Sequence, residues 1–322
     1  MVNTDTSTSV TVSLGSTSYT ASTSSSSKSV SFTLSQLGTW TVKVTKNGVV
    51  GTDTVAVTQL GMTYTISVIP LSTILNQNNW TTIKQQSDAG TATNYWKVGD
   101  TKTITISGTV AGVAFNRSVN VFIAEFNHNA SREGSNRIHF LIGRSDTDSS
   151  KLLGLAANYG GSSSGFMMNN SNTSSGGWSS SYMRNTILGQ SPNSPTSGSL
   201  MAALPSDLRS VMKSVNKYTN NSSSSTASVT ATTDYLFLMS EYEANGTNYS
   251  SAAAEKSYQT QYEYFRAGNT IATQRSDNQS LTGVVWTRSP MSGSTAYFTS
   301  LNNGVSIDSP TKSYLVVAGF CV

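Results

Sequence analysis

Two acidic residues are the first candidates for catalysis in this sequence. Glu241 and Glu243 stand two positions apart in a segment that we expect to be a strand, so both carboxyl groups would lie on one face of a sheet. Such a pair could supply the acid and the base for glycoside cleavage. Spacing alone is a weak signal, and the chain has no Gly-x-Ser-x-Gly nucleophile elbow. We therefore predict no catalytic residues and no enzyme, and we keep hydrolysis of cell-wall glycan as an alternative.

The two histidines and the single cysteine offer little further chemistry. His128 and His139 are eleven residues apart, which matches none of the spacings that zinc sites use. We interpret His128, at the end of a predicted strand, as a hydrogen-bonded structural residue. Cys321 lies in an apolar segment and fits a small buried side chain better than a reactive thiol. We expect no metal and no cofactor.

Trp178, Arg184, Trp286 and Arg288 allow two interpretations. In the structural one, each guanidinium lies against an aromatic face or a main-chain carbonyl and holds irregular backbone in place. In the functional one, these side chains line a saccharide-binding or protein-binding surface. The structural interpretation is favoured, and the four residues are kept as candidate ligand-binding positions.

Loops rich in Gly, Asn and Ser provide the remaining candidates. The segments 158–175 and 297–308 have this composition, and loops on a rigid scaffold commonly carry binding residues. The second segment contributes Tyr297, Asn302 and Asn303 to the candidate ligand site. We expect binding specificity to reside in these loops.

The elements that must position these residues fall into two parts. Residues 1–69 alternate apolar and polar positions, which predicts an all-β sandwich with Trp40 in its core and a tight hairpin at Asn47-Gly48. Residues 71–322 predict an α+β domain whose last strand pairs back into its own sheet. The pattern places helices at 80–89, 179–188, 206–215 and 252–265, and strands at 103–107, 119–126 and 235–239.

Composition limits the class of protein. Only 11% of residues are charged, whereas Ser and Thr together number 100 of 322. The net charge of +4 is spread along the chain without a basic run, so we do not expect nucleic-acid binding. The sequence shows no signal peptide and no apolar stretch of membrane-spanning length, so we expect no membrane insertion. A weakly charged surface without an export signal suits a phage structural protein, which lysis releases, or a piece of a longer bacterial adhesin.

Several motifs together resemble a known family. In order along the chain they are Asn79-Trp80-Thr-Thr-Ile83-Lys84, Tyr95-Trp96-Lys97-Val98-Gly99-Asp100, Phe126-Asn127-His128-Asn129, Gly177-Trp178 with Tyr182-Met183-Arg184, Trp286-x-Arg288-Ser289-Pro290 and Gly319-Phe320. Over residues 71–322 they resemble a domain of unknown function common in gut bacteria and their phages. The resemblance implies a C-type-lectin-like fold, distantly related to formylglycine-generating enzymes and to phage receptor-binding proteins. The enzymes depend on paired active-site cysteines, and this chain has only Cys321, so their activity is not carried over.

The first part also resembles a known module. Leu37-Gly38-Thr39-Trp40-Thr-Val42 followed by Lys46-x-Gly48 is similar to immunoglobulin-like modules of phage tail and surface proteins. The pairing of domains predicts a non-enzymatic virion structural protein of the tail-fibre or head-fibre type, an adhesin that attaches to the host surface. Its expected partners are other virion proteins, further copies of itself and a host-surface glycan or protein. A purely structural decoration subunit is the other alternative, and the expected location is the virion surface or, alternatively, the bacterial cell surface.

Overall fold

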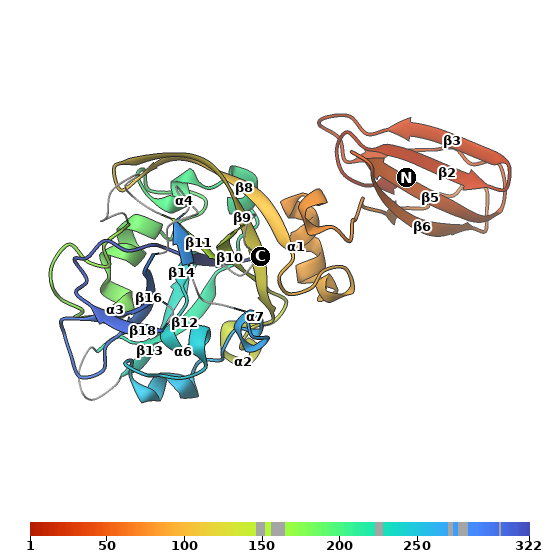
Figure 1. Cartoon of the computed structure of the whole chain (residues 1–322). Helices are drawn as coiled ribbons and strands as arrows, with labels where there is room; N and C mark the ends of the chain where they lie inside the picture. The colour runs from red at the N-terminus through yellow and green to blue at the C-terminus, as the bar shows by residue number, and fades with distance from the viewer. Residues whose placement is uncertain (146–151, 156–164, 223–227, 270–272, 276–282, 303) are drawn as a thin grey trace. The chain divides into compact units, whose positions relative to one another are not determined.

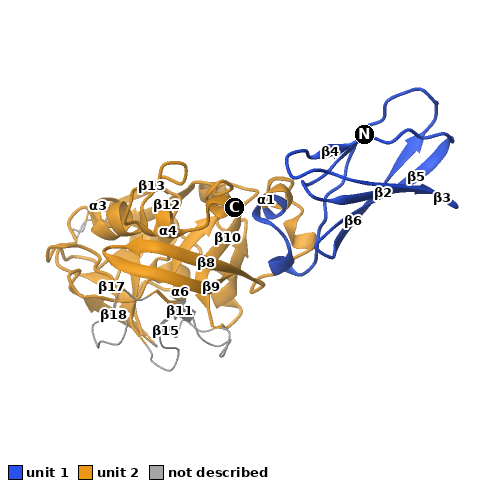
Figure 2. Ribbon diagram, turned by 90° about the horizontal axis from the view of Figure 1, so that it is seen from above, with its two compact units in different colours: residues 1–83 blue, residues 84–322 orange. Residues whose placement is uncertain are grey.

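The computed structural model describes residues 1–145, 152–155, 165–222, 228–269, 273–275, 283–302 and 304–322 (Figure 1). The chain forms two compact units, Met1–Ile83 and Lys84–Val322 (Figure 2). Strands make up 38% of the described residues and helices 18%, which confirms a β-rich fold. None of the helices in the described ranges is long and apolar enough to cross a membrane.

Unit 1 contains two small sheets. The strands β4 (Ser29–Val30), β1 (Val2–Asn3) and β7 (Ile66–Ser67) form one, and β3 (Thr17–Ser22), β2 (Ser9–Leu14), β5 (Gly38–Lys46) and β6 (Val49–Val57) form the other. Trp40, Val42 and Val44 alternate along β5 and are completely buried, because alternate residues of a strand share one face. The indole of Trp40 donates to the carbonyl of Gln36 at 3.1 Å and stacks on Tyr19. The prediction that Trp40 is a core residue is confirmed.

The hairpin between β5 and β6 follows from its turn residues. Asn47 and Gly48 both have left-handed backbone, with φ of 50° and 81°, which Asn and Gly tolerate best. The predicted Asn-Gly hairpin is therefore present. The apolar and polar residues that alternate over 30–34 form only a short strand, since only Ser29–Val30 pair.

The boundary between the units lies within a helix. After the short turn η1 (Leu75–Gln77), helix α1 (Trp80–Asp88) begins at Asn79, whose side-chain oxygen accepts from the amide of Thr82 at 2.7 Å. Its end near Gly90, which has a φ of 69°, also agrees with the predicted helix. The units divide after Ile83, whereas the change of pattern in the sequence lies at residues 69–71.

A seven-stranded sheet forms the framework of unit 2. Strand β10 (Ile138–Arg144) pairs with β9 (Val113–Phe126) and with β19 (Ala318–Cys321). The other strands are β8 (Thr101–Val110), β11 (Leu152–Gly154), β14 (Phe237–Leu238) and β15 (Thr273–Arg275). The run from Val121 to Ala124 in β9 is fully buried, as expected of a central strand.

The last strand of the chain pairs back into this sheet, as predicted. Phe320 of β19 stacks on Phe140 of β10 at 5.2 Å between ring centroids. Gly319 lies against the ring of Phe237, where a methyl group would overlap ring carbon atoms. Cys321 is completely buried, and burial raises the pKa of its thiol to about 12. This confirms that Cys321 is a buried structural residue.

Two smaller sheets complete unit 2. The strands β12 (Val215–Asn220) and β13 (Val229–Asp234) form one, and β16 (Val285–Pro290), β17 (Phe298–Leu301) and β18 (Val305–Asp308) form the other. The helices are short. They are η2 (Ala92–Asn94), α2 (Ala130–Glu133), α3 (Gly177–Ser180), the π-helical turn η3 (Met183–Leu188), α4 (Leu200–Ala203), α5 (Ser206–Arg209), α6 (Glu241–Asn245), η4 (Ala253–Ser257) and α7 (Glu263–Arg266).

Three of the predicted helices need correction. The one expected over 206–215 ends at Arg209, because the amide of Lys213 instead donates to Cys321 of β19 at 2.9 Å. The one expected over 252–265 is two separate turns, η4 and α7. The one expected over 179–188 is divided between α3 and η3 at Ser181.

Candidate functional site

Trp178 and Arg184 share one buried carboxylate. The indole of Trp178 donates to Oδ2 of Asp234 at 2.8 Å, and Nε of Arg184 donates to Oδ1 at 2.7 Å. Trp178 is completely buried, and the side chain of Arg184 is 16% exposed. Both residues therefore anchor the segment around η3 to the end of β13.

Trp286 and Arg288 are also internal. The indole of Trp286 donates to the carbonyl of Phe166 at 2.8 Å, and Nη1 of Arg288 donates to the carbonyl of Leu238 at 2.8 Å. Both side chains are completely buried. The proposed ligand-binding role of Trp178, Trp286 and Arg288 is thus corrected, because side chains without exposed surface cannot contact a ligand in this state. Their geometry matches the structural interpretation.

Arg288 belongs to a set of buried charged and aromatic side chains that we call the buried charge cluster. Its members are His128, Glu133, His139, Lys217, Glu243, Tyr262 and Arg288. Lys217 Nζ donates to Glu133 Oε2 at 2.7 Å, to Glu243 Oε1 at 3.0 Å and to the hydroxyl of Tyr262 at 2.9 Å. Arg288 forms a two-pronged ion pair with Glu243. Two carboxylates thus face two cations, which compensates the cost of burying each charge.

The motif Phe126-Asn127-His128-Asn129 carries His128 into this cluster. Asn127 and Asn129 both adopt left-handed backbone, with φ of 52° and 44°. His128 Nδ1 then lies 2.6 Å from Oε2 of Glu125, at the end of β9. The prediction that His128 is hydrogen-bonded is confirmed, and its side chain is completely buried.

The pKa values of the two buried histidines shift in opposite directions. Burial alone would lower the pKa of His128, but the surrounding carboxylates, Glu133 first, outweigh it and raise that pKa. Burial and the nearby cations lower the pKa of His139 well below its usual value. His128 therefore keeps its proton to a higher pH than an ordinary histidine, whereas His139 loses its proton at a lower pH.

His128, Glu133 and Glu243 are also the residues that could hold a metal ion. One ligand atom from each lies within 4.8 Å of the others. However, Lys217 and Arg288 already neutralise the two carboxylates, and both cations hold the pKa of Glu243 well below normal although burial would raise it. A divalent ion would therefore have to displace a buried cation. That no metal is bound remains a prediction.

Glu241 and Glu243 do not lie on a strand, as the sequence pattern suggested, but in the first turn of α6. Ser240 begins this helix with a reciprocal pair of hydrogen bonds to Glu243, the capping box. Glu241 is completely buried, and its carboxylate accepts the backbone amides of Tyr249 at 2.7 Å, Ser250 at 3.0 Å and Ser251 at 2.6 Å. Neither carboxylate faces solvent, so neither is placed to protonate a bound glycan.

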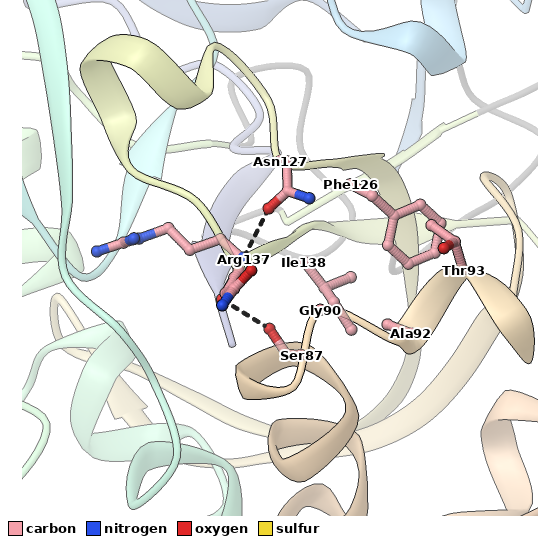
Figure 3. A pocket seen from close by; sticks show the side chains of 9 residues that line it. Ser87, Gly90, Ala92, Thr93, Phe126, Asn127, Arg137 and Ile138 are labelled. Atoms are coloured by element: carbon pink, nitrogen blue, oxygen red, sulfur yellow. Dashed lines mark hydrogen bonds between the residues drawn. The ribbon is translucent and has the colours of Figure 1, made fainter.

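Two pockets of the structure lack the size or the lining residues of an active site. Figure 3 shows the first, a pocket of about 40 Å³ lined by Thr93, Phe126 and Asn127, where the guanidinium of Arg137 extends away from Phe126. It is far below the roughly 300 Å³ of small-molecule sites. The second, about 350 Å³ in unit 1, is lined mainly by apolar and hydroxyl side chains such as Phe32 and Met62. Neither brings an acid and a base together.

One surface of unit 2 consists of three segments without charged residues. The segments are 169–175, 245–251 and 291–302, which contain no Asp, Glu, Lys, Arg or His. We call their exposed residues the hydroxyl–amide surface, since Asn169, Ser174, Ser251 and residues 298–301 are buried. The amide of Ser174 donates to Thr295 at 2.7 Å, and the amide of Ser292 donates to Ser250 at 2.9 Å. The middle of the third segment therefore joins the other two.

This surface includes part of the predicted ligand site. Tyr297 is 40% exposed and Asn302 is exposed, whereas Asn303 lies outside the described residues. The described part of the predicted loop 158–175 contacts the residues on either side of the predicted loop 297–308. The amide of Ser174 donates to the carbonyl of Thr295 at 2.7 Å, and the hydroxyl of Ser309 donates to Asn172 at 2.7 Å. Tyr249, which is 69% exposed, was not among the predicted ligand-binding residues. The Ser-x-x-Glu signature before it could have identified the capped helix, but no signal predicted the loop that carries this tyrosine.

Comparison with known proteins gives one match, to a protein family, within unit 2. No curated protein and no solved structure matches the sequence. A family match covers Trp178, Arg184, Trp286, Arg288 and the whole hydroxyl–amide surface, and its description names no activity. As the sequence motifs predicted in part, a domain of unknown function (DUF6273) is found in this chain at residues 158–315.

Proposed function

We propose that this protein is a non-enzymatic structural protein of a phage virion that attaches to the host surface through unit 2. One observation carries the proposal. The acidic residues that could have served catalysis, Glu241 and Glu243, are completely buried and fully engaged by backbone amides or cations. The exposed part of the same domain offers hydroxyl, amide and tyrosine groups, which suit binding better than acid–base chemistry.

The proposal includes a finer assignment of the two units. We assign unit 1 as an immunoglobulin-like module and unit 2 as a C-type-lectin-like domain. The two packed sheets around Trp40 support the first assignment. A terminal strand that returns to the central sheet, with long connections between β10 and β19, supports the second. In this arrangement unit 1 would attach to other virion proteins, and the assembly would contain several copies of the chain.

Binding of the labelled full-length chain to intact bacteria tests the proposal. The panel contains Gram-positive and Gram-negative gut bacteria, each with and without periodate treatment, which destroys vicinal diols of surface sugars. We expect saturable binding to a few strains. Binding lost after periodate identifies a surface glycan, and binding that survives it identifies a surface protein.

Two results would contradict attachment. If the chain binds none of the strains, the purely structural decoration role becomes the better explanation. If the chain releases reducing sugars from purified cell walls, it is a hydrolase. In that case Glu241→Gln and Glu243→Gln would show whether either carboxylate takes part.

A further inference from the structure

The hydroxyl–amide surface has a composition that selects for one kind of ligand. Its three segments contain no charged residue. Ser309, which donates to Asn172, follows Asp308, and the carboxylate of Asp308 is neutralised by Lys312 at 2.6 Å. A charged ligand would lose its hydration here without gaining a partner of opposite charge. The surface therefore fits a ligand that is polar but uncharged.

Two tyrosines give this surface its apolar contacts. Tyr249 is 69% exposed and Tyr297 is 40% exposed. Within the part of the chain that the structure describes, neither ring stacks on another ring and neither hydroxyl has a hydrogen-bond partner. Large aromatic side chains are usually buried, because each hides 150–250 Å² or so of surface from water. The two exposed rings in one uncharged neighbourhood therefore offer a ligand apolar contacts.

The backbone beneath both tyrosines is fixed. Three successive amides, those of Tyr249, Ser250 and Ser251, donate to the buried carboxylate of Glu241. The amide of Met291 donates to the carbonyl of Tyr297 at 3.0 Å, and Met291 itself bridges to Ser251. A ligand that stacks on these rings would lose little free energy in ordering the protein.

We propose that the hydroxyl–amide surface binds a neutral oligosaccharide, whose apolar ring faces stack on Tyr249 and Tyr297. The sugar hydroxyls pair with exposed amides and hydroxyls such as those of Asn172, Ser292 and Asn302. A sugar combines an apolar face with a hydroxylated rim, and this surface offers the matching groups for both. The inference rests on the proposed attachment function and names its ligand class and its main contact residues.

The test uses the full-length chain and an array of neutral and acidic bacterial polysaccharides, alongside the bacterial strains described above. We expect Tyr249→Ala and Tyr297→Ala each to weaken binding about tenfold, as the loss of one aromatic stacking contact implies. Tyr249→Phe and Tyr297→Phe keep the ring and should retain most of the affinity. Leu60→Ala, which removes an exposed apolar side chain of unit 1, should bind like the unchanged protein.

The outcomes separate this inference from the proposed function. If the chain binds cells but both alanine variants bind equally well, attachment stands and the tyrosine site is wrong. If the variants lose binding that periodate does not affect, or if only acidic polysaccharides bind, the surface recognises a protein or an anion and the neutral-sugar inference is overturned. If the unchanged chain binds neither cells nor polysaccharides, both proposals fail.

Discussion

Glu243 connects three elements of unit 2 through its two carboxylate oxygen atoms. Oε1 accepts from Lys217 of β12, while Oε2 accepts the amide of Ser240 at the start of α6 at 3.0 Å, and both oxygens pair with Arg288 of β16. All of these groups are completely buried. Removing the charge would leave two cations in the protein interior with too few anions, which is more costly than losing one hydrogen bond.

Glu243→Gln preserves the shape of the side chain and removes its charge. We expect it to reduce the free energy of unfolding by about 3–5 kcal/mol, the usual cost of breaking a buried ion pair. Urea denaturation followed by circular dichroism measures the change. Glu263→Gln alters an exposed carboxylate and should shift stability by less than about 0.5 kcal/mol. A loss below about 1 kcal/mol in Glu243→Gln would mean that the cluster is hydrated or otherwise relaxed.

Glu255 makes the free energy of unfolding fall as pH rises, which is the opposite of the usual effect of a carboxyl group. Its carboxyl group accepts from the amide of Asn220 and the hydroxyl of Ser289, both at 2.8 Å, yet burial raises its pKa from 4.5 to about 7. The folded protein therefore binds more protons than the unfolded chain between these values. The contribution of Glu255 is complete below pH 4.5 and falls by about 3 kcal/mol as pH rises to 7.

Glu255→Gln removes this contribution and leaves the other titrating groups in place. Between pH 4.5 and pH 8 we expect the unchanged protein to lose about 3 kcal/mol of unfolding free energy relative to the variant. Unfolding free energies across this range, measured in parallel, provide the test. The raised pKa would be contradicted if the difference in unfolding free energy between the two proteins stayed constant, or if the unchanged protein gained stability relative to the variant as pH rises.

Residue types alone could predict only part of the buried interior of the protein. Trp40 and Cys321 were placed in the core because each lies in an alternating or continuous apolar pattern. The burial of Lys217, Glu243 and Arg288 could not be predicted, because a charged residue is buried only where partners distant in sequence neutralise it. Such partners become visible only when β12, α6 and β16 are brought together.

At the level of secondary structure, the elements found from sequence are those whose signals are local. Helix α1 begins at an Asn cap and ends beside a Gly, both readable in the sequence. The helix expected over 252–265 fails because tertiary bonds interrupt it. Gln259 donates from its side chain to the carbonyl of Tyr218 at 2.6 Å, and the amide of Tyr262 donates to Glu243 at 2.9 Å. Tyr262 and Phe265 of this segment are nonetheless buried, whereas Tyr258 is half-buried.

The packing of β19 gives a prediction for one element. Gly319 has no room for a side chain, because a methyl group would overlap the ring of Phe237 on β14. We expect Gly319→Ala to lower the free energy of unfolding by about 1–3 kcal/mol through overpacking. Gly304→Ala is the matched control, since no atom lies within 4 Å of its added methyl group and its backbone is not left-handed. Equal thermal midpoints for the two variants would show that β14 can move away from β19.

For the molecule as a whole, the division into two units has a thermodynamic consequence. Unit 1 has its own core around Trp40, and unit 2 has its own around β9, β10 and β19. Folding units with separate cores can unfold in separate transitions. The low fraction of charged residues in the chain, 11%, means that the surface of each unit contributes mainly hydroxyl and amide groups. Because the cores are separate, a substitution in the core of unit 1 can lower the stability of that unit without changing the hydroxyl–amide surface of unit 2.

Trp40→Ala tests this independence. Removing a completely buried indole should destabilise unit 1 by about 3–5 kcal/mol, and differential scanning calorimetry should show one transition shifted downward while the other stays in place. Phe140→Leu, in the core of unit 2, should shift the other transition. Binding to bacterial cells should survive in Trp40→Ala below the temperature at which unit 2 unfolds, because the hydroxyl–amide surface lies entirely in unit 2. A single transition that moves as one in both variants would mean that the two units unfold together, and binding would then be lost with either core.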